Sequence, residues 1–178
     1  MITIISGSNR KGNLSKLVAN IYRDKLSSKY KGKIKIIYLE QMPSSVLNPD
    51  MYAKMDDWVK DIRDNILKPS EAFVFVIPEY NGTFPGVLKI FADAVSSDIK
   101  DNVFEDKKAA LIGLSAGKFG NRVGLEHFST VLNYLKANVY HQKIAIANIF
   151  DYINEDMDFS DTDIEKYLDK QIDGFLRF

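Results

Sequence analysis

The chain of 178 residues contains no cysteine, one tryptophan and only two histidines. Without cysteine it can form no disulfide, no thiolate nucleophile and no cysteine-held zinc or iron–sulfur cluster. Basic and acidic side chains number 24 each and the formal net charge is +0, so bulk charge attracts neither nucleic acid nor an anionic membrane. No apolar run approaches the length of about 18 residues that suggests a transmembrane helix. We therefore expect no nucleic-acid partner and no membrane partner.

The beginning of the chain also lacks the pattern of a secretory signal. Residues 1–6 read as a strand, with no basic segment or apolar core of a signal peptide before them, which predicts a cytoplasmic location. An apolar content of 46% is enough for a sizeable core. Because the length suits one domain and no repeat, linker or low-complexity tract interrupts it, we expect residues 1–178 to form a single domain.

Strand and helix patterns alternate along the chain. Apolar runs of strand length occupy residues 1–6, 34–39, 72–77, 109–114 and 139–147. Amphipathic helical spacing follows each run, at residues 14–22, 49–66 with Asn48-Pro49 at its start, 84–95 with Pro85 in its first turn, 125–135, and 164–176 with Ser160-Asp161-Thr162-Asp163 as its opening. Such alternation predicts a three-layer α/β sandwich, a parallel sheet with helices on both faces. Because there are five strands, the order 2-1-3-4-5 is preferred over the six-strand order of dinucleotide-binding folds.

The loop after the first strand, residues 7–15, has the composition of a phosphate cradle. It combines two glycines, hydroxyl and amide side chains and Arg10, and a predicted helix N-terminus follows it. Asn13-Leu14 stand where a nucleotide triphosphatase would carry Lys and Ser or Thr, and Asn9 replaces the second glycine of the dinucleotide fingerprint. A single phosphate monoester fits best. The alternative is a turn rich in Ser, Asn and Gly that binds nothing.

Two further loops are expected at the same edge of the sheet. The 2-1-3-4-5 order places residues 78–83 beside the first loop, with residues 115–121 closing the far side of the crevice. The run from Pro78 to Thr83 offers amides, a carboxylate, a hydroxyl and Tyr80, which can stack on a ring, so it suits the flat polar edge of a conjugated ring system. The alternative is that Tyr80 and Phe84 are core aromatics and Glu79 is a solvated charge.

Together these segments resemble a known family. Gly-Ser-Asn-Arg-Lys-Gly-Asn-Leu-Ser at residues 7–15, Pro-Glu-Tyr-Asn-Gly-Thr-Phe-Pro-Gly-Val-Leu-Lys at residues 78–89, and the group Gly117, Gly120 and Arg122 are similar to the NADPH-dependent FMN reductases. That family has a flavodoxin-like fold and includes quinone, azo-dye and chromate reductases. The similarity runs from residue 1 to about residue 135, and Pro-Glu-Tyr-Asn-Gly is its most specific part.

The resemblance implies an FMN site built from all three loops. The residues implied for the phosphate are Ser8, Arg10, Asn13, Leu14 through its amide, and Ser15. Those implied beside the isoalloxazine and ribityl chain are Pro78, Glu79, Tyr80, Asn81, Gly82 and Thr83, with Ser115, Gly117 and Gly120 on the other side. The chain departs from the family at Asn13 and Ser15, where Ser and Asn are common, at Ile90-Phe91-Ala92, and at Asn121, which interrupts the usual Gly-Gly pair.

The implied activity is an NAD(P)H-dependent oxidoreductase. A hydride from NADPH or NADH would pass to bound FMN and then to a small acceptor, namely a flavin, quinone, azo compound or metal oxyanion, with the chemistry at the flavin and no catalytic side chain required. The resemblance also implies a homodimer or homotetramer. The alternatives are a flavodoxin-type electron carrier, which the balanced charge and the first loop argue against, and a binding or regulatory module that takes up no FMN.

Metal and hydrolytic chemistry are disfavoured. His127 and His141 fall in a predicted helix and a predicted strand without HExxH spacing, so we expect structural histidines and no bound metal. No GxSxG elbow supports a serine hydrolase.

Overall fold

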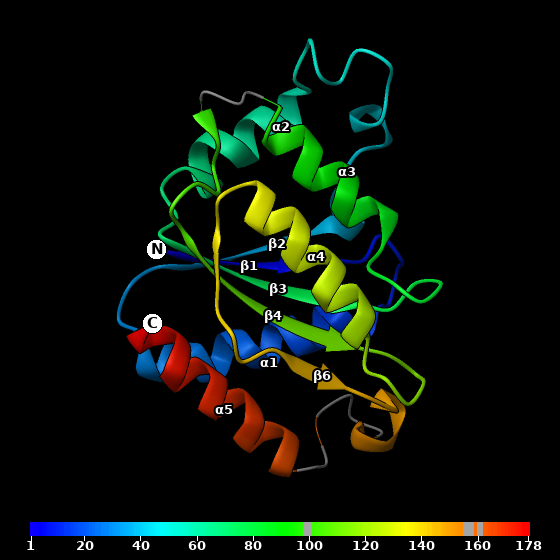
Figure 1. Ribbon diagram of the computed structural model, residues 1–178, viewed down its shortest axis with the longest axis vertical. Coiled ribbons are helices and arrows are strands. Elements are labelled where there is room, and N and C mark those ends of the chain that lie inside the picture. The colour runs from blue at the N-terminus through cyan, green and yellow to red at the C-terminus, as the bar shows by residue number, and fades with distance from the viewer. Residues whose placement is uncertain (98–100, 155–158, 160–161) are drawn as a thin grey trace.

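A twisted parallel sheet forms the centre of the computed structural model, which describes residues 1–97, 101–154, 159 and 162–178 (Figure 1). The strands run in the order β2-β1-β3-β4-β5, and β6 also pairs with β4. They are β1 (Ile2–Ser6), β2 (Ile34–Tyr38), β3 (Ala72–Pro78), β4 (Lys108–Leu114), β5 (Asn138–Val139) and β6 (Ile144–Ile146). The helices are α1 (Leu14–Lys29), α2 (Asp57–Ile62), α3 (Gly86–Val95), α4 (Arg122–Tyr134) and α5 (Thr162–Arg177), with short turns at Leu39–Gln41, Ser44–Val46 and Ile149–Tyr152.

The predicted flavodoxin-like order is confirmed, but the predicted single fifth strand at 139–147 is wrong. Two short strands replace it, both parallel to β4, so the sheet has six strands. Four residues, the buried Tyr140 and the polar residues 141–143, separate them in the sequence. The amide of Gln171 in α5 donates to the carbonyls of Leu111 (3.1 Å) and Gln142 (2.7 Å), so a side chain supplies hydrogen bonds where the strand ladder is interrupted.

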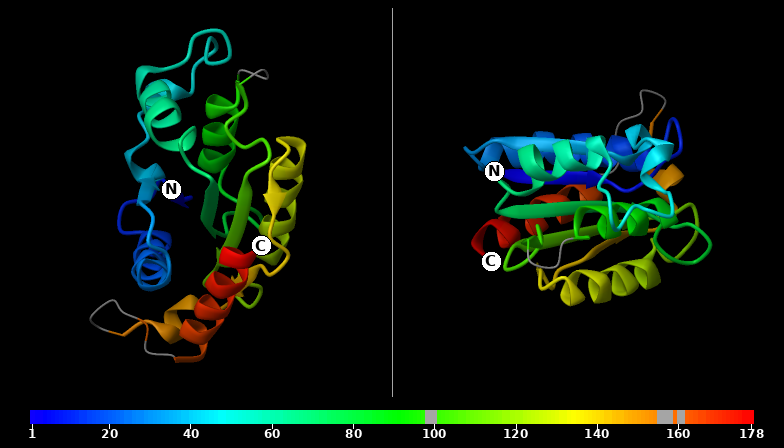
Figure 2. Two further views of the ribbon diagram at one scale, coloured as in Figure 1. Left: turned by 90° about the vertical axis from the view of Figure 1, so that its left-hand side faces the viewer. Right: turned by 90° about the horizontal axis from the view of Figure 1, so that it is seen from above.

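Helices cover both faces of the sheet, as predicted. Figures 1 and 2 show α2, α3 and α4 on one side and α1 with α5 on the other. Strand β3 lies between β1 and β4, and its first six residues are buried. Successive side chains point to opposite faces, so Phe73 and Phe75 join the core under α3 and α4 while Val74 and Val76 join the core under α1 and α5.

Two predicted helix starts differ from the structure. Asn48-Pro49 does not open α2, because the Asn48 side chain accepts from the amide of Asp50 (2.8 Å) and closes a turn. The helix begins instead behind Asp56, whose carboxylate accepts from the amide of Trp58 (2.9 Å), and it continues as a π-helical turn at Arg63–Leu67. Pro85 precedes α3 at the N-cap position rather than lying in its first turn. The predicted opening of the last helix, at 160–163, lies largely outside the described residues.

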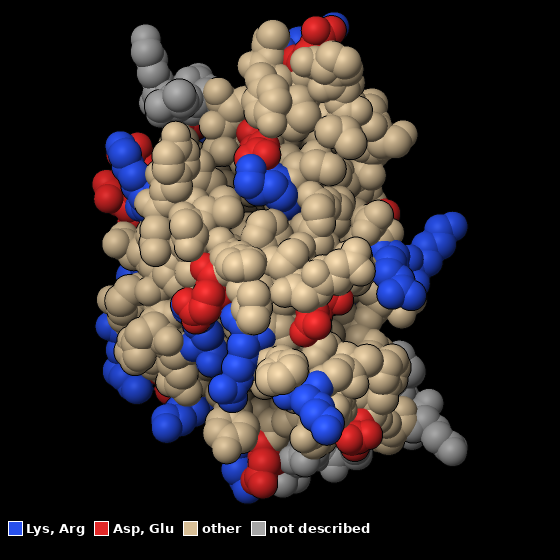
Figure 3. Space-filling model, turned by 45° about the vertical axis from the view of Figure 1, so that its right-hand side comes forward, with Lys and Arg blue, Asp and Glu red and all other residues tan. Residues whose placement is uncertain are grey.

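Surface charge is mixed on the face drawn in Figure 3. Lysines and arginines lie among carboxylates and uncharged side chains there, in keeping with the formal net charge of +0. Among the described residues, no helix combines the length and the apolar character needed to cross a membrane.

Candidate functional site

The three loops predicted to meet do lie together at the carboxyl edge of the sheet. The hydroxyls of Ser8 and Tyr80 share a hydrogen bond of 2.5 Å, which joins the first loop to the second. The side-chain amide of Asn121 donates to the carbonyls of Ile77 and Pro78, both at 3.0 Å, which joins the third loop to the base of the second. The carboxyl ends of β1, β3 and β4 thus carry one continuous site.

The first loop is shaped by the N-cap of α1. Asn13 has extended dihedral angles (φ −78°, ψ 143°), and its side-chain oxygen accepts from the amide of Lys16 (2.9 Å) and the hydroxyl of Ser15 (2.7 Å). Its NH₂ group donates to the carbonyl of Arg10 (2.6 Å), which folds the loop back onto the helix end. Gly12 takes a φ of +65°, which L side chains rarely adopt.

Unpaired amides at this helix end form an anion cradle. Within the described chain, the backbone N–H groups of residues 11–15 donate to no acceptor. Residues 11–13 immediately precede the 16-residue helix α1 and residues 14 and 15 open its first turn, where the helix dipole adds positive potential. The exposed side chain of Arg10 adds a full charge, and it makes no ion pair with any described residue. Together these groups suit one phosphate.

A neighbouring carboxylate does not cancel that charge. Glu40 lies beside the cradle and accepts from Asn13 (3.0 Å), but it also pairs with Lys16 at 2.6 Å. Its hydrogen bond raises the pKa of the Lys16 ammonium. Because Lys16 and Glu40 balance each other, the cations of the loop that pair with no described carboxylate are Arg10 and the exposed Lys11, and Arg10 is the one that lies near the ring of Tyr80.

The structure assigns different tasks to the residues implied for the phosphate. All five lie in one loop, yet the side chains of Asn13 and Ser15 are used by the helix cap. The Ser8 hydroxyl is fully buried and is shared between Tyr80 and the amide of Arg10 (3.1 Å). The groups left free for a ligand are therefore backbone amides and the Arg10 guanidinium.

The second loop is a tight hairpin. Tyr80 and Thr83 exchange backbone hydrogen bonds of 2.9 and 3.2 Å, and Asn81 and Gly82 both have positive φ, at 50° and 79°. Two consecutive left-handed residues are the signature of a type I′ turn, for which Asn-Gly is the preferred pair. The Thr83 hydroxyl shares a 2.9 Å hydrogen bond with Nδ1 of His127 on α4, which fixes the far end of the hairpin.

The side chain of Tyr80 reaches toward the first loop. Besides its bond to Ser8, its ring lies 6.0 Å from the guanidinium carbon of Arg10. The aromatic residue that the sequence offered for stacking on a ring is thus directed over the phosphate cradle in this structure. Tyr80 therefore couples the two ends of the site.

The third loop is held from within by Ser115. Its hydroxyl donates to the carbonyl of Gly117 (2.9 Å) and accepts from the amide of Gly120 (3.0 Å). Gly120 has a φ of 57°, and a Cβ there would lie 2.6 Å from the backbone carbon of Ala145. Ser115 and Gly120 thus shape the loop from behind, whereas Gly117 has open space around its Cβ position and leaves the loop backbone accessible.

Sequence reasoning missed three residues at the site. Phe119 at the tip of the third loop is 72% exposed, Asn121 binds the end of β3, and His127 pairs with Thr83. Only Asn121 carried a signal, as a departure from the Gly-Gly pattern. The partner of His127 lies 44 positions away in the sequence, and no pattern in the sequence marked Phe119. Neither histidine belongs to a group of side chains that could hold a metal within the described residues.

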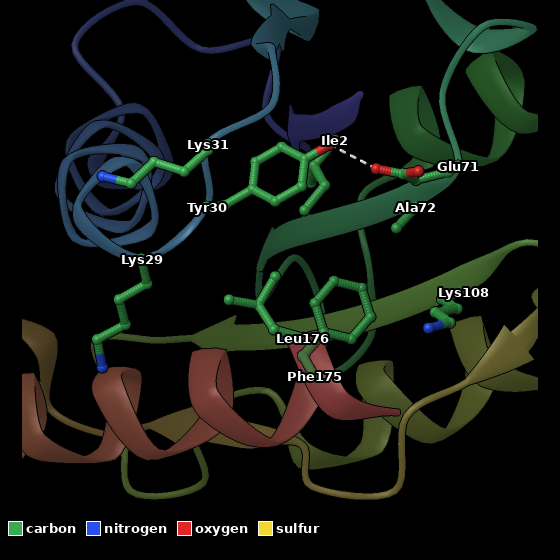
Figure 4. A pocket seen from close by; sticks show the side chains of 9 residues that line it. All are labelled: Ile2, Lys29, Tyr30, Lys31, Glu71, Ala72, Lys108, Phe175 and Leu176. Atoms are coloured by element: carbon green, nitrogen blue, oxygen red, sulfur yellow. Dashed lines mark hydrogen bonds between the residues drawn. The ribbon is translucent and has the colours of Figure 1, made fainter.

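A separate cavity of about 460 Å³ lies at the opposite edge of the sheet (Figure 4). It opens between the amino ends of β1, β3 and β4 and the C-terminal ends of α1 and α5. Tyr30 donates a hydrogen bond to Glu71 at its rim, which raises the pKa of the tyrosine to about 12. Helix carbonyl ends and lysines, rather than free amides, surround it, so it lacks the features of the phosphate cradle.

Comparison with known proteins agrees with this geometry. The family model described as NADPH-dependent FMN reductase matches residues 1–151, a segment that contains all three loops. The chain belongs to this family. The resemblance inferred from the three loops is thereby confirmed, and FMN with NAD(P)H as co-substrate fits the family.

Curated relatives are similar over part of their length. A quinone reductase of Pseudomonas putida is 31% identical over 121 residues, which are 67% of this chain and 62% of that protein. An NAD(P)H-dependent FMN reductase of Pseudomonas aeruginosa is 36% identical over 89 residues, which are 49% of this chain and 47% of that protein. The matched segments thus span about half to three fifths of these relatives.

Solved structures confirm the fold. FerB, a flavoenzyme NAD(P)H:(acceptor) oxidoreductase from Paracoccus denitrificans, superposes with a TM-score of 0.83 over 99% of this chain and 94% of its own, at 21% identity. An azoreductase from Bacillus anthracis gives a TM-score of 0.66 over 99% of both chains at 16% identity. At these identities the likeness concerns the arrangement of strands and helices.

Proposed function

We propose that this member of the family is an NAD(P)H-dependent oxidoreductase that holds FMN across its three loops and reduces a small acceptor. The observation that carries the proposal is the cradle of unpaired amides closed by Arg10, which lies directly beside the hairpin of the second loop. A phosphate needs donors that are already in place, and a helix N-terminus supplies them at no further cost in reorganisation. We treat residues 1–178 as one FMN-binding unit.

Each loop has a distinct part in this proposal. Amides of residues 11–15 and the Arg10 guanidinium bind the phosphate end. The hairpin at 78–83 and the loop at 115–120 border the flat ring, with backbone groups of Gly117 exposed toward it. When bound, FMN supplies the redox chemistry, accepting a hydride from NAD(P)H and passing the electrons to a flavin, quinone, azo compound or metal oxyanion. The chain contributes placement, exclusion of water and fixed amide dipoles.

We also propose that the protein forms a homodimer or homotetramer. A groove of about 750 Å³ lies between α3 and α4, and its lining includes Tyr52 and Tyr134, which are 65% and 86% exposed. Two ion pairs border the groove, Lys89–Asp93 and Lys136–Glu105, so its rim carries both positive and negative groups. In a dimer with a two-fold axis, the lysines of one copy can therefore face the carboxylates of the other. Sedimentation as a dimer or tetramer is expected, and a monomer at working concentration would contradict this part.

Anaerobic mixing of FMN-loaded protein with NADPH or NADH tests the proposed reaction. Rapid bleaching of the visible flavin band by the nicotinamide alone is expected of the oxidoreductase. Bleaching only after addition of a separate reductase protein would identify an electron carrier instead. A purified chain that takes up no FMN would contradict both and leave a binding or regulatory module.

A further inference from the structure

Asn121 is a buried polar residue that the proposed reaction does not use. It is 1% exposed and has a left-handed backbone (φ 63°, ψ 31°) at the N-terminal end of α4. A residue in that place commonly caps its helix with its side chain. Asn121 makes no such bond, because its side chain is turned toward β3.

The side-chain amide of Asn121 holds the point where β3 becomes the second loop. Its nitrogen donates to the carbonyls of Ile77 and Pro78, both at 3.0 Å. On the other side of the same peptide, the amide of Glu79 donates to the carbonyl of Leu114 on β4 (2.9 Å). The first residues of the second loop are therefore fixed by β4 and by the third loop together.

Two glycines near Asn121 leave no room for a side chain of their own. A Cβ on Gly124 would lie 2.1 Å from the side-chain oxygen of Asn121 and 2.7 Å from the amide nitrogen of Phe84. Gly120, which precedes Asn121, has positive φ and packs against the backbone of Ala145. A side chain at Gly124 would push α4 away from Asn121 and the end of the second loop, whereas one at Gly120 would collide with β6 behind the third loop.

We propose that Asn121 is a positioning residue that sets the spacing between the second and third loops, and with it the width of the slot for a flavin ring. The inference rests on the proposed function, because the slot matters only if these loops border FMN. Asn121 acts through the Ile77 and Pro78 carbonyls and not by touching the phosphate cradle, which lies on the first loop. Loss of the Asn121 side chain should therefore weaken binding of the flavin ring and leave binding of the phosphate unchanged.

The test compares Asn121→Gly with Asp106→Gly. Glycine tolerates the positive φ at position 121 and removes the side chain with its amide, so the chain should still fold. Asp106 is a matched control because it also has a positive φ (60°) and is exposed, at the start of β4 on the opposite edge of the sheet. Asn121→Asp is a second variant, since its carboxylate would face two carbonyl oxygens in nearly the same volume.

For Asn121→Gly and Asn121→Asp we expect FMN and riboflavin to bind about tenfold more weakly, by the same factor for both ligands, as the loss of two buried hydrogen bonds suggests. The visible circular dichroism of bound flavin and its midpoint potential should shift. Hydrogen exchange of residues 79–84 without flavin should quicken. Asp106→Gly should leave all of these unchanged.

The outcomes separate this inference from the proposed function. A wild-type chain that binds no FMN overturns the proposed function, and exchange at residues 79–84 still shows whether Asn121 holds the second loop. Wild-type flavin binding together with unaltered affinity, dichroism and exchange in Asn121→Gly overturns the inference alone. An effect on FMN but not on riboflavin would place Asn121 at the phosphate, which also overturns it.

Discussion

Replacement of Arg10 by alanine should weaken FMN binding through the phosphate alone. The guanidinium makes no ion pair with any described residue and lies 6.0 Å from the ring of Tyr80, whereas Lys16 and Glu40 pair with each other. A charge-assisted hydrogen bond contributes about 1.5–3 kcal/mol, and because Arg10 is exposed and screened by solvent we expect the lower half of that range, which is about a tenfold to fortyfold rise in Kd.

Titration of flavin fluorescence or absorbance measures this effect for FMN and for riboflavin, which lacks the phosphate. Arg10→Ala should bind FMN more weakly than the wild type and riboflavin with unchanged affinity. Added salt should reduce the difference in FMN affinity between the wild type and the variant. Lys11→Ala is the matched control, an exposed cation beside Arg10 in the same loop. An equal loss for both flavins, or an equal loss in Lys11→Ala, would refute the assignment of Arg10 to the phosphate.

Three further predictions concern stability. Tyr22 is fully buried, which raises the pKa of its hydroxyl, and that hydroxyl has no hydrogen-bond partner among the described residues. Tyr22→Phe should therefore keep the free energy of unfolding in urea or raise it by up to about 1 kcal/mol. A loss of that size would show that the hydroxyl has a hydrogen-bond partner. Asn13→Ala removes the cap of α1 and should cost about 1 kcal/mol in the same assay, and no loss would show that the cap is dispensable. Hydrogen bonds from Lys68 and Arg63 lower the pKa of Asp101. Its contribution to the free energy of unfolding is therefore present above the usual carboxyl pKa and is lost as the pH falls through the lowered value. Asp101→Asn should make the free energy of unfolding less dependent on acid pH, and an unchanged pH profile would contradict the pairing.

Much of the fold could be predicted because its signals are local. The continuous apolar run of β3 and the strand, loop and helix at the start of the chain need no distant partner to be recognised. The helix start predicted at Asn48-Pro49 was wrong because these residues suit a turn as well as a helix start. The helix begins where Asp56, further along the chain, caps it. The interruption near residue 140 involves Gln171, which lies in the last helix.

The candidate site also has a part that the sequence predicts and a part that it does not. Parallel α/β topology alone brings the three loops to one edge, so their meeting followed from the strand order. The contacts that fix their geometry follow from no local pattern: Tyr80 with Ser8, Thr83 with His127, and Asn121 with the end of β3. Each joins residues more than 40 positions apart and depends on the finished packing.

The proposed function requires this chain to pass electrons from a nicotinamide to FMN held on its three loops. Single-turnover bleaching of the FMN-loaded protein, with NADPH carrying deuterium or protium at the transferred position of C4, tests it most directly. We predict complete bleaching by the nicotinamide alone, slower with deuterium, followed by recovery of the flavin band when a quinone is added. A flavin band that persists with NADPH and with NADH would contradict the claim.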